Sequence, residues 1–295
     1  MTTAGSMSDA ECFRFLGDPL LSLEEVFDFE SRIATDPVRF VRRYGAPGDR
    51  EVAGLVASVF AYGAVEQIGR TLSRVFNVLG DSPRDFVLNR LNTENPPFEG
   101  FYHRFNNRED LLTLLWAIAQ QLKRWGSLEN LFLNGYTPGD ISHGMDSFSG
   151  AFIEMAGGTP FPGGRNFSYF FPSPRKGSPC KRMCLYLRWM NRKDMVDPGG
   201  WAGVDRSDLV VPVDTHIERI ARYLGFTRRK NPSWKMAVEI TQGLKKLNRE
   251  DPLRMDFLLC HLGMSGRCPR KENPDRCREC ILQSVCHRKS LECRG

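Results

Sequence analysis

The chain has 295 residues, of which 41% are hydrophobic and 26% are charged, and its formal net charge is +6. These values lie in the range of globular proteins and exclude an intrinsically disordered chain. No run of about 18 apolar residues occurs, which excludes a membrane span, and the first residues lack the basic and apolar regions of a secretory signal. We therefore expect a cytoplasmic protein with one large domain or two small ones.

Helical spacing dominates the pattern of apolar residues, and strand signals are poor. Apolar positions recur three and four residues apart in five segments, which are residues 52–60, 68–79, 111–122, 145–155 and 217–224. Asp251 followed by Pro252 is typical of a helix start, and Gly263 can end that helix. We expect an all-α protein in which these apolar stripes form the core.

Two loops interrupt the helical pattern, at residues 91–108 and 157–180. The second loop is rich in glycine, proline and aromatic residues, and its rings are Phe161, Phe167, Tyr169, Phe170 and Phe171. The simpler interpretation is that these rings pack under the loop as part of the core. The alternative is that they stack against a base extruded from a nucleic acid.

Lys181 follows a turn that contains Gly177 and lies in the first turn of a predicted helix. It lies off the apolar stripe of that helix, which consists of Cys180, Met183, Cys184, Leu187 and Met190. The N-terminus of a helix is the positive end of its dipole, so this position and the adjacent Arg182 disfavour a charged ammonium. A lysine poised to be neutral is a nucleophile that can form a Schiff base. The alternative is an ordinary solvated lysine.

Asp214 lies at the end of a short apolar run, just before another helix. Thr215 and Glu218 fit a capping box, which predicts that this helix starts just after Thr215 and that Asp214 precedes the cap. A carboxylate in that place can simply complement the helix dipole. Alternatively, it can face a cleft, where it stabilises positive charge or activates a nucleophile. We expect His216 to be structural or at the surface.

The C-terminal segment combines closely spaced cysteines with positive charge. Residues 266–295 hold eight Lys or Arg against four Asp or Glu, and their cysteines follow the pattern Cys268-x8-Cys277-x2-Cys280-x5-Cys286. Four thiolates this close in sequence converge only around a metal centre, because bare thiolates would repel one another. A single C-x2-C pair favours an iron–sulfur cluster, and structural zinc is the alternative. The basic residues are then either a solvated tail or a surface that faces phosphates.

Three segments together resemble the helix-hairpin-helix DNA glycosylase superfamily, in its iron–sulfur endonuclease III group. Gly177 to Lys181 match the G-x-x-x-K of the family's hairpin and lysine, and Val213-Asp214-Thr215-His216 matches its aspartate motif. The cysteine segment matches the family's loop with a first gap two residues longer. The lysine and the aspartate are farther apart than in endonuclease III, at 33 residues. This separation and the segment Lys181 to Met190 resemble a poorly characterised bacterial family related to the archaeal 8-oxoguanine DNA glycosylases.

The resemblance implies a two-lobed helix-hairpin-helix architecture with a C-terminal four-cysteine cluster loop. One lobe would join residues 1–50 to residues 225–295, with the cluster loop at 266–290. The other would be a helical barrel over residues 51–224 that carries the lysine and aspartate motifs. Cys268, Cys277, Cys280 and Cys286 would ligate a 4Fe-4S cluster that orders a basic loop over DNA. The protein would be a monomer of the bacterial cytosol or nucleoid that binds duplex DNA containing a damaged base, without a membrane partner.

The activity implied by the resemblance is that of a DNA glycosylase and AP lyase in base excision repair, acting on an oxidised purine such as 8-oxoguanine. Lys181 would attack the sugar C1′ and displace the base, and the resulting Schiff base would permit β-elimination at the 3′ phosphate. Asp214 would accept the lysine proton or stabilise the oxocarbenium ion. Tyr62 is a candidate wedge for the gap left by the flipped base, with core packing as its alternative. Trp189 and Trp201 are candidates to sandwich the base, and Trp189 fits the core equally well.

Two other functions fit parts of the sequence. Pro179 stands where the family hairpin has its second glycine, and proline lacks the amide N–H that would approach a DNA phosphate. This favours a nucleic-acid-binding module of the same fold that does no chemistry. The other function is that of a zinc-stabilised helical protein that binds a partner protein. No motif encodes which base is excised, whether the strand is cleaved, or whether RNA is a substrate.

Overall fold

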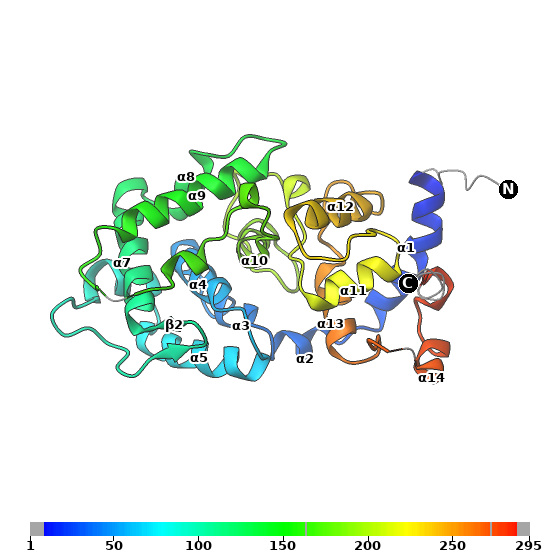
Figure 1. Cartoon of the computed structure of the whole chain (residues 1–295), viewed down its shortest axis with the longest axis horizontal. Coiled ribbons are helices and arrows are strands. Elements are labelled where there is room, and N and C mark those ends of the chain that lie inside the picture. Colours follow the sequence, from blue (N-terminus) through cyan, green and yellow to red (C-terminus); the bar gives the residue numbers. More distant parts are fainter. Residues whose placement is uncertain (1–8, 163, 272, 288–295) are drawn as a thin grey trace. The chain divides into compact units, whose positions relative to one another are not determined.

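The computed structural model describes residues 9–162, 164–271 and 273–287 and divides them into two units. The larger unit consists of residues 29–208, and the smaller unit joins the described residues up to 28 to those from 209 onward. Most of the described residues are helical, and the strands among them are two short ones (Figure 1). The prediction of an all-α protein is therefore confirmed. None of the helices in this part of the chain has the length and apolar character needed to cross a membrane.

The larger unit contains short and long helices with one small hairpin. In chain order its elements are α2 (Phe29–Ile33), α3 (Val38–Val41), α4 (Pro47–Val59), α5 (Val65–Leu79), α6 (Pro83–Asp85), the π-helix η1 (Phe86–Arg90), β1 (Tyr102–His103), β2 (Asn106–Asn107), α7 (Arg108–Trp125), α8 (Leu128–Leu133), α9 (Ile141–Ala156), the 3-10 helices η2 (Phe167–Phe170) and η3 (Pro174–Lys176), α10 (Lys181–Asn191) and the 3-10 helix η4 (Arg206–Asp208). The strands pair antiparallel, with Tyr102 opposite Asn107. Asn107 also caps α7 through a capping box with Asp110, which fixes the hairpin to the start of that helix.

The core of the larger unit lies around α4, which packs against α10 (Figure 1). Residues 51–59 of α4 are all buried, because the helix is apolar on nearly every side. At Gly54 a side chain would collide with α10, since a Cβ there would lie 2.8 Å from Met190 Cε. This close approach brings the N-terminal end of α10 and the residues that follow α4 into contact. The remaining core is formed where α7, α8 and α9 pack against one another.

The smaller unit contains α1 (Asp9–Glu25), α11 (Thr215–Tyr223), α12 (Trp234–Lys245), α13 (Asp256–Met264), α14 (Pro274–Arg278) and the 3-10 helix η5 (Gln283–Val285). Its best-packed pair is α11 on α13. The prediction that a helix begins at Asp251-Pro252 and ends at Gly263 is wrong at both ends. Residues 252–255 form turns and α13 starts at Asp256, with Gly263 inside it. A Cβ on Gly263 would lie 2.7 Å from the Cβ of His216, so the glycine allows α11 to approach.

Both boundaries between the units differ from those expected at residues 50 and 224. The segment 29–50 belongs to the larger unit, because α3 packs against α4 and α5. The segment 209–224 belongs to the smaller unit, because α11 packs against α13 and the amide of Val211 donates to Thr241 Oγ1 in α12 at 3.0 Å. Asp214 therefore lies in the smaller unit, and not in one lobe with Lys181. Sequence periodicity could not place these boundaries, because each depends on contacts between segments far apart in the chain.

The aromatic loop between α9 and α10 packs mainly inward. Its buried rings are Phe161, Phe167, Phe170 and Phe171, which agrees with the simpler interpretation of that loop. Tyr169 is the exception, with 42% of its surface exposed. The loop thus contributes one accessible ring to the surface of the larger unit.

Candidate active site

Lys181 is the first residue of α10, and the backbone before it turns sharply. Ser173 caps η3, and Gly177 then adopts the left-handed conformation with φ of 80°. Cys180, at the N-cap position of α10, is also left-handed, with φ of 49° and ψ of 33°, and no side chain caps this helix. A residue with a Cβ is rarely stable in this conformation, and such strain is often found at functional sites. The predicted helix start at the lysine and the buried stripe that follows it are confirmed.

The two cations at the start of α10 are bound by backbone carbonyls at the end of α4. Lys181 is half-buried, and its Nζ donates to the carbonyl of Ala61 at 3.4 Å. Arg182 is buried and donates to the carbonyl of Val59 at 3.2 Å and to that of Tyr169. Burial lowers the pKa of Arg182 below its usual range. Carbonyls at a helix C-terminus carry partial negative charge, so the end of α4 compensates for cations that the start of α10 disfavours.

Tyr62 directly follows Ala61, whose carbonyl accepts the ammonium of Lys181, and the guanidinium of Arg182 lies 5.2 Å from the centroid of its ring. Its hydroxyl donates to Asn106 Oδ1 at 2.6 Å or to the carbonyl of His103 at 3.0 Å. Burial raises the pKa of Tyr62 to about 12, so the phenol is neutral. The structure thus brings together two residues that the sequence singled out separately. The ring is half-buried and tethered at its hydroxyl, which is a poor arrangement for a wedge that must insert into DNA.

The two tryptophans proposed to sandwich a base lie inside the larger unit. Trp189 is completely buried in α10, which agrees with its core alternative. Trp201 is 6% exposed, donates from Nε1 to Glu51 Oε1 at 2.9 Å, and packs edge-on against Tyr186. In this structure neither ring presents a face to a ligand. Both tryptophans are therefore part of the core, which the sequence pattern had not indicated for Trp201.

Asp214 is itself the N-cap of α11, and Thr215 is the first helical residue. This corrects the predicted start by one residue. One carboxylate oxygen, Oδ1, accepts the backbone N–H groups of His216 and Ile217, each at 2.8 Å. The other oxygen, Oδ2, accepts the thiol of Cys260 in α13 at 3.4 Å. The carboxylate is half-buried, so one oxygen is fully used by the helix and the other faces a sulfur.

The cysteine segment follows α13 in the smaller unit, and the part of the predicted loop beyond residue 287 lies outside the described residues. Cys268, Cys277 and Cys280 are half-buried and Cys286 is exposed. Burial raises the pKa of the Cys268 thiol, the guanidinium of Arg219 opposes this rise, and the thiols of Cys280 and Cys286 add to it. In the part of the chain that the structure describes, no three His, Cys, Asp or Glu side chains are arranged to hold a metal ion. The donor set itself, four thiols, is of the kind that an iron–sulfur cluster or zinc binds.

Sequence reasoning missed two residues that complete the surroundings of Lys181. Phe105, at the turn between β1 and β2, is 50% exposed, and Arg182 is a buried cation between two tyrosines. The sequence gives no signal for the burial of Arg182, because buried arginines are rare. The signal available in the sequence was the aromatic Tyr-His-Arg-Phe run at 102–105, which lies in a loop where exposed rings need a reason.

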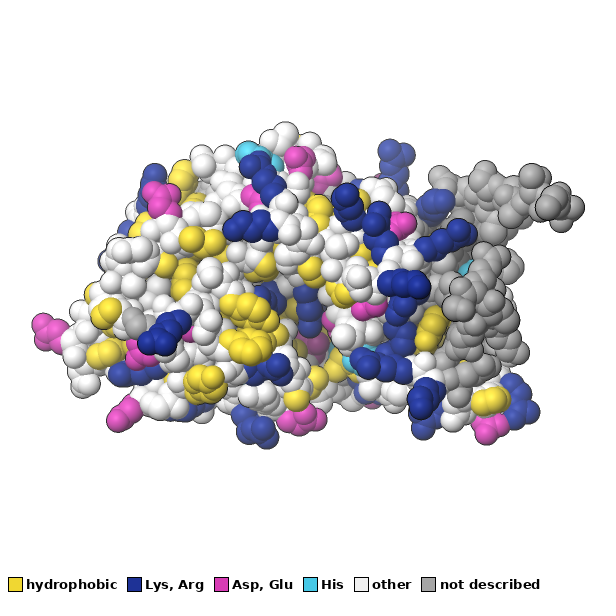
Figure 2. Space-filling view, in the orientation of Figure 1, with side chains coloured by type: hydrophobic (Ala, Val, Ile, Leu, Met, Phe, Trp, Pro, Cys, Tyr) yellow, Lys and Arg dark blue, Asp and Glu magenta, His cyan; other side chains and the backbone are white. Residues whose placement is uncertain are grey.

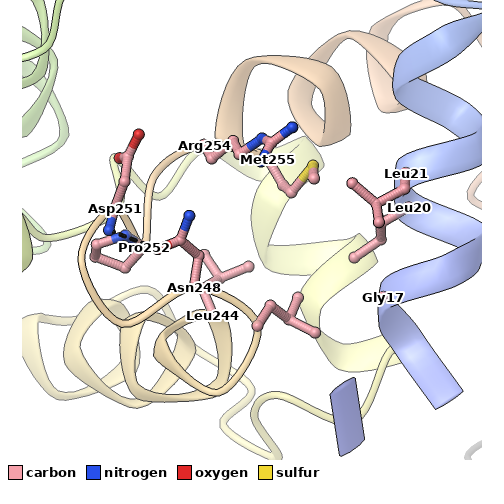
Figure 3. Close-up of a pocket in the computed structure, with 10 residues that line it drawn as sticks. Gly17, Leu20, Leu21, Leu244, Asn248, Asp251, Pro252, Arg254 and Met255 are labelled. Atoms are coloured by element: carbon pink, nitrogen blue, oxygen red, sulfur yellow. Dashed lines mark hydrogen bonds between the residues drawn. The ribbon is translucent and has the colours of Figure 1, made fainter. Parts of the chain in front are cut away.

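A pocket of about 260 Å³ lies in the smaller unit between α1 and the turn after α12 (Figure 3). Leu20 and Leu21 of α1 lie opposite Asn248 and Asp251, and Leu244 lies beside Asn248. None of the residues that the sequence singled out for chemistry lines this pocket. The pocket therefore gives no support to the lysine and aspartate motifs.

Comparison with known proteins gives a family match over most of the chain. A family model described as "Protein of unknown function (DUF2400)" matches residues 36–265. The matched range contains Lys181 and Asp214 and ends before Cys268. No curated protein and no solved structure matches the chain.

Proposed function

We propose that the chain, which belongs to this DUF2400 family, is a DNA glycosylase that removes a damaged base and then cleaves the strand. The observation that supports this most is the position of Lys181. Lys181 is the first residue of α10, after the left-handed Cys180, and its ammonium lies within hydrogen-bond distance of the carbonyl of Ala61, the residue before Tyr62. A lysine that is half-buried and held by a backbone carbonyl can act as a nucleophile towards a bound substrate.

In the proposed reaction, the amine of Lys181 attacks C1′ of a nucleotide whose base has been flipped out of the duplex. As the bond from Nζ to C1′ forms, the bond between C1′ and the base breaks, and the base leaves with the bonding electrons and takes up the proton that Nζ loses. Ring opening of the sugar gives a Schiff base between C1′ and Nζ. Loss of the proton at C2′ then expels the 3′ phosphate. The substrate class we propose, an oxidised purine such as 8-oxoguanine, rests on the sequence resemblance.

Asp214 and the cysteine segment contribute to the proposal through the sequence. For Asp214 we propose that its carboxylate favours the cationic stages of the reaction. Cys268, Cys277, Cys280 and Cys286 would hold a 4Fe-4S cluster, which supplies structural order and takes no part in base removal. The chain's own basic residues in that segment, Arg267, Arg270 and Arg276 among them, would contact phosphates, with an affinity that falls as salt rises.

The decisive experiment is borohydride trapping on a duplex that contains 8-oxoguanine. The wild-type protein should form a covalent adduct, Lys181→Ala should form none, and Lys176→Ala should trap normally. Lys176 is a matched control, because it is an exposed lysine in η3, five residues before Lys181. The same preparation is analysed for iron and zinc, which separates a cluster from structural zinc. An adduct that persists in Lys181→Ala would exclude Lys181 as the nucleophile.

A second function, a nucleic-acid-binding module without catalysis, is favoured by Pro179. This residue lies in the turn directly before Cys180 and has no amide N–H to offer a phosphate. If this second function holds, the protein binds duplex DNA in a salt-dependent manner, yet it forms no adduct with 8-oxoguanine or with a bare abasic site.

A further inference from the structure

Three aromatic side chains gather at the surface beside Lys181, and we call Tyr62, Phe105 and Tyr169 the aromatic cluster. They come from three segments: the residues after α4, the turn between β1 and β2, and η2. Phe105 is 50% exposed and Tyr169 is 42% exposed. Figure 2 shows exposed hydrophobic side chains on the larger unit, with Lys and Arg side chains next to them. Neighbouring exposed rings from separate segments cost free energy in water and so call for a function.

The aromatic cluster is held in a fixed geometry. The rings of Tyr62 and Phe105 are parallel within 4°, with centroids 6.3 Å apart, and Tyr169 meets both of them edge-on. The hydroxyl of Tyr62 is anchored to the hairpin at Asn106. Arg104, directly before Phe105, has a φ of 54°, so the turn is strained in presenting that ring. Rings that are already fixed lose little entropy when a flat ligand binds.

Cations lie against the faces of these rings. The guanidinium of Arg182 is 4.2 Å from the centroid of Tyr169 and 5.2 Å from that of Tyr62. Arg104 lies 5.3 Å from the centroid of Phe105. With the ammonium of Lys181 near Ala61, the surroundings of the aromatic cluster are positively charged. A matching ligand is therefore a flat aromatic group carried on an anionic chain, which is the chemistry of an unpaired nucleotide.

We propose that the aromatic cluster binds an unpaired nucleobase by stacking. Phe105 and Tyr169 supply the accessible ring surfaces, and Tyr62, tethered by its hydroxyl, supports them from behind. The site deepens the proposed function, on which it rests for its biological context, because it would hold a displaced base close to Lys181. The stacking itself does not need Lys181 or any chemical step. Every base has an aromatic face, so binding should depend on the presence of bases more than on their identity.

The test measures fluorescence anisotropy of two labelled 12-mers, oligo-dT and a strand of the same length made of abasic tetrahydrofuran units. Wild-type protein should bind oligo-dT more tightly than the abasic strand. Phe105→Ala and Tyr169→Ala should each weaken oligo-dT binding about tenfold and leave abasic binding unchanged. Phe105→Trp should retain binding, because it keeps a flat ring. Tyr102→Ala, a 67% exposed tyrosine on the same hairpin but outside the aromatic cluster, should bind as wild type.

The outcomes separate this site from the proposed catalysis. Lys181→Ala should keep the preference for oligo-dT over the abasic strand, even if loss of its charge weakens both, while it forms no borohydride adduct. Equal wild-type affinity for the two strands overturns the stacking site, whether or not an adduct forms. The proposal is also overturned if Tyr102→Ala weakens oligo-dT binding as much as Phe105→Ala does. The effect would then not be specific to the aromatic cluster. Thermal melting of each variant shows that it is folded, and the abasic strand reports any loss of general affinity.

Discussion

The helices α10 and α11 begin with the two residues proposed for chemistry, and they begin in opposite ways. At the start of α11, Asp214 accepts two backbone N–H groups, as a good N-cap does. At the start of α10 there is no side-chain cap, the N-cap residue Cys180 is left-handed, and two cations follow it. The residues at the start of α11 stabilise that helix, whereas those at the start of α10 destabilise it.

This difference affects how each residue can be interpreted. Helix stability alone explains an aspartate at the position of Asp214, so its geometry does not by itself call for a catalytic role. Helix stability does not explain Lys181, because a cation at the first helical position is unfavourable and a left-handed cysteine costs about 1–3 kcal/mol. A sequence keeps such features where another demand opposes them. The geometry therefore supports a functional role more strongly for the lysine than for the aspartate.

Since its start is unfavourable, α10 must be held elsewhere, and its C-terminal half supplies the anchor. Arg188 and Arg192 both bind the carboxylate of Asp197, and all three side chains are almost completely buried. The backbone after the helix returns to it, where the amide of Gly199 donates to the carbonyl of Trp189 at 3.0 Å. Buried ion pairs and a backbone hydrogen bond at the C-terminal end of α10 thus stabilise a helix whose N-terminal end is strained.

The largest expected effect is on this anchor. Asp197→Ala removes the buried carboxylate that Arg188 and Arg192 share and should lower the free energy of unfolding by about 3–5 kcal/mol. Urea denaturation followed by circular dichroism measures the loss. Asp194→Asn is the control, because Asp194 binds Arg192 but its side chain is 37% exposed, and it should cost less than about 1 kcal/mol. If both variants lose equally little, α10 does not depend on this anchor and the comparison fails.

The next effect separates the two roles of Asp214. Asp214→Ala removes the cap of α11 and should cost about 0.5–2 kcal/mol in the free energy of unfolding. Asp214→Asn and Asp214→Ser still cap and should stay near wild-type stability. Under the proposed function, Asp214→Asn should nevertheless trap far less adduct than wild type. If Asp214→Asn forms as much borohydride adduct as wild type, Asp214 has only the structural role of capping α11.

Local pattern was enough to predict several of the long helices of this fold, but not its short helices or its hairpin. The apolar spacing at 52–60 and 217–224 coincides with α4 and α11, and the stripe from Cys180 to Met190 is buried as expected. The start of α11 was predicted one residue late, because Asp214 and Thr215 are both good caps and only the geometry distinguishes them. The helix expected after Pro252 begins at Asp256, since turn-forming and helix-starting residues overlap in type.

The surroundings of Lys181 could be predicted only in part. The lysine and Tyr62 stood out in the sequence, yet their proximity follows from the packing of α10 on α4, which no local pattern encodes. Phe105 and Tyr169 come from different loops, and their meeting is a long-range result of the same packing. Arg182 is buried because carbonyls and rings converge on it, and this too depends on contacts across the chain.

The smallest effect tests the unfavourable start of α10 directly. Lys181→Gln removes a cation from the positive end of the helix dipole but keeps an N–H donor for the carbonyl of Ala61. The free energy of unfolding should therefore stay the same or rise by about 0.3–1 kcal/mol, although adduct formation is lost. The neighbouring Arg182→Gln should instead destabilise the protein by about 1–3 kcal/mol, because Arg182 is buried and its bonds to two carbonyls are structural. A loss of stability in Lys181→Gln as large as that in Arg182→Gln would show that the lysine supports the fold, and the argument from its unfavourable position would no longer hold.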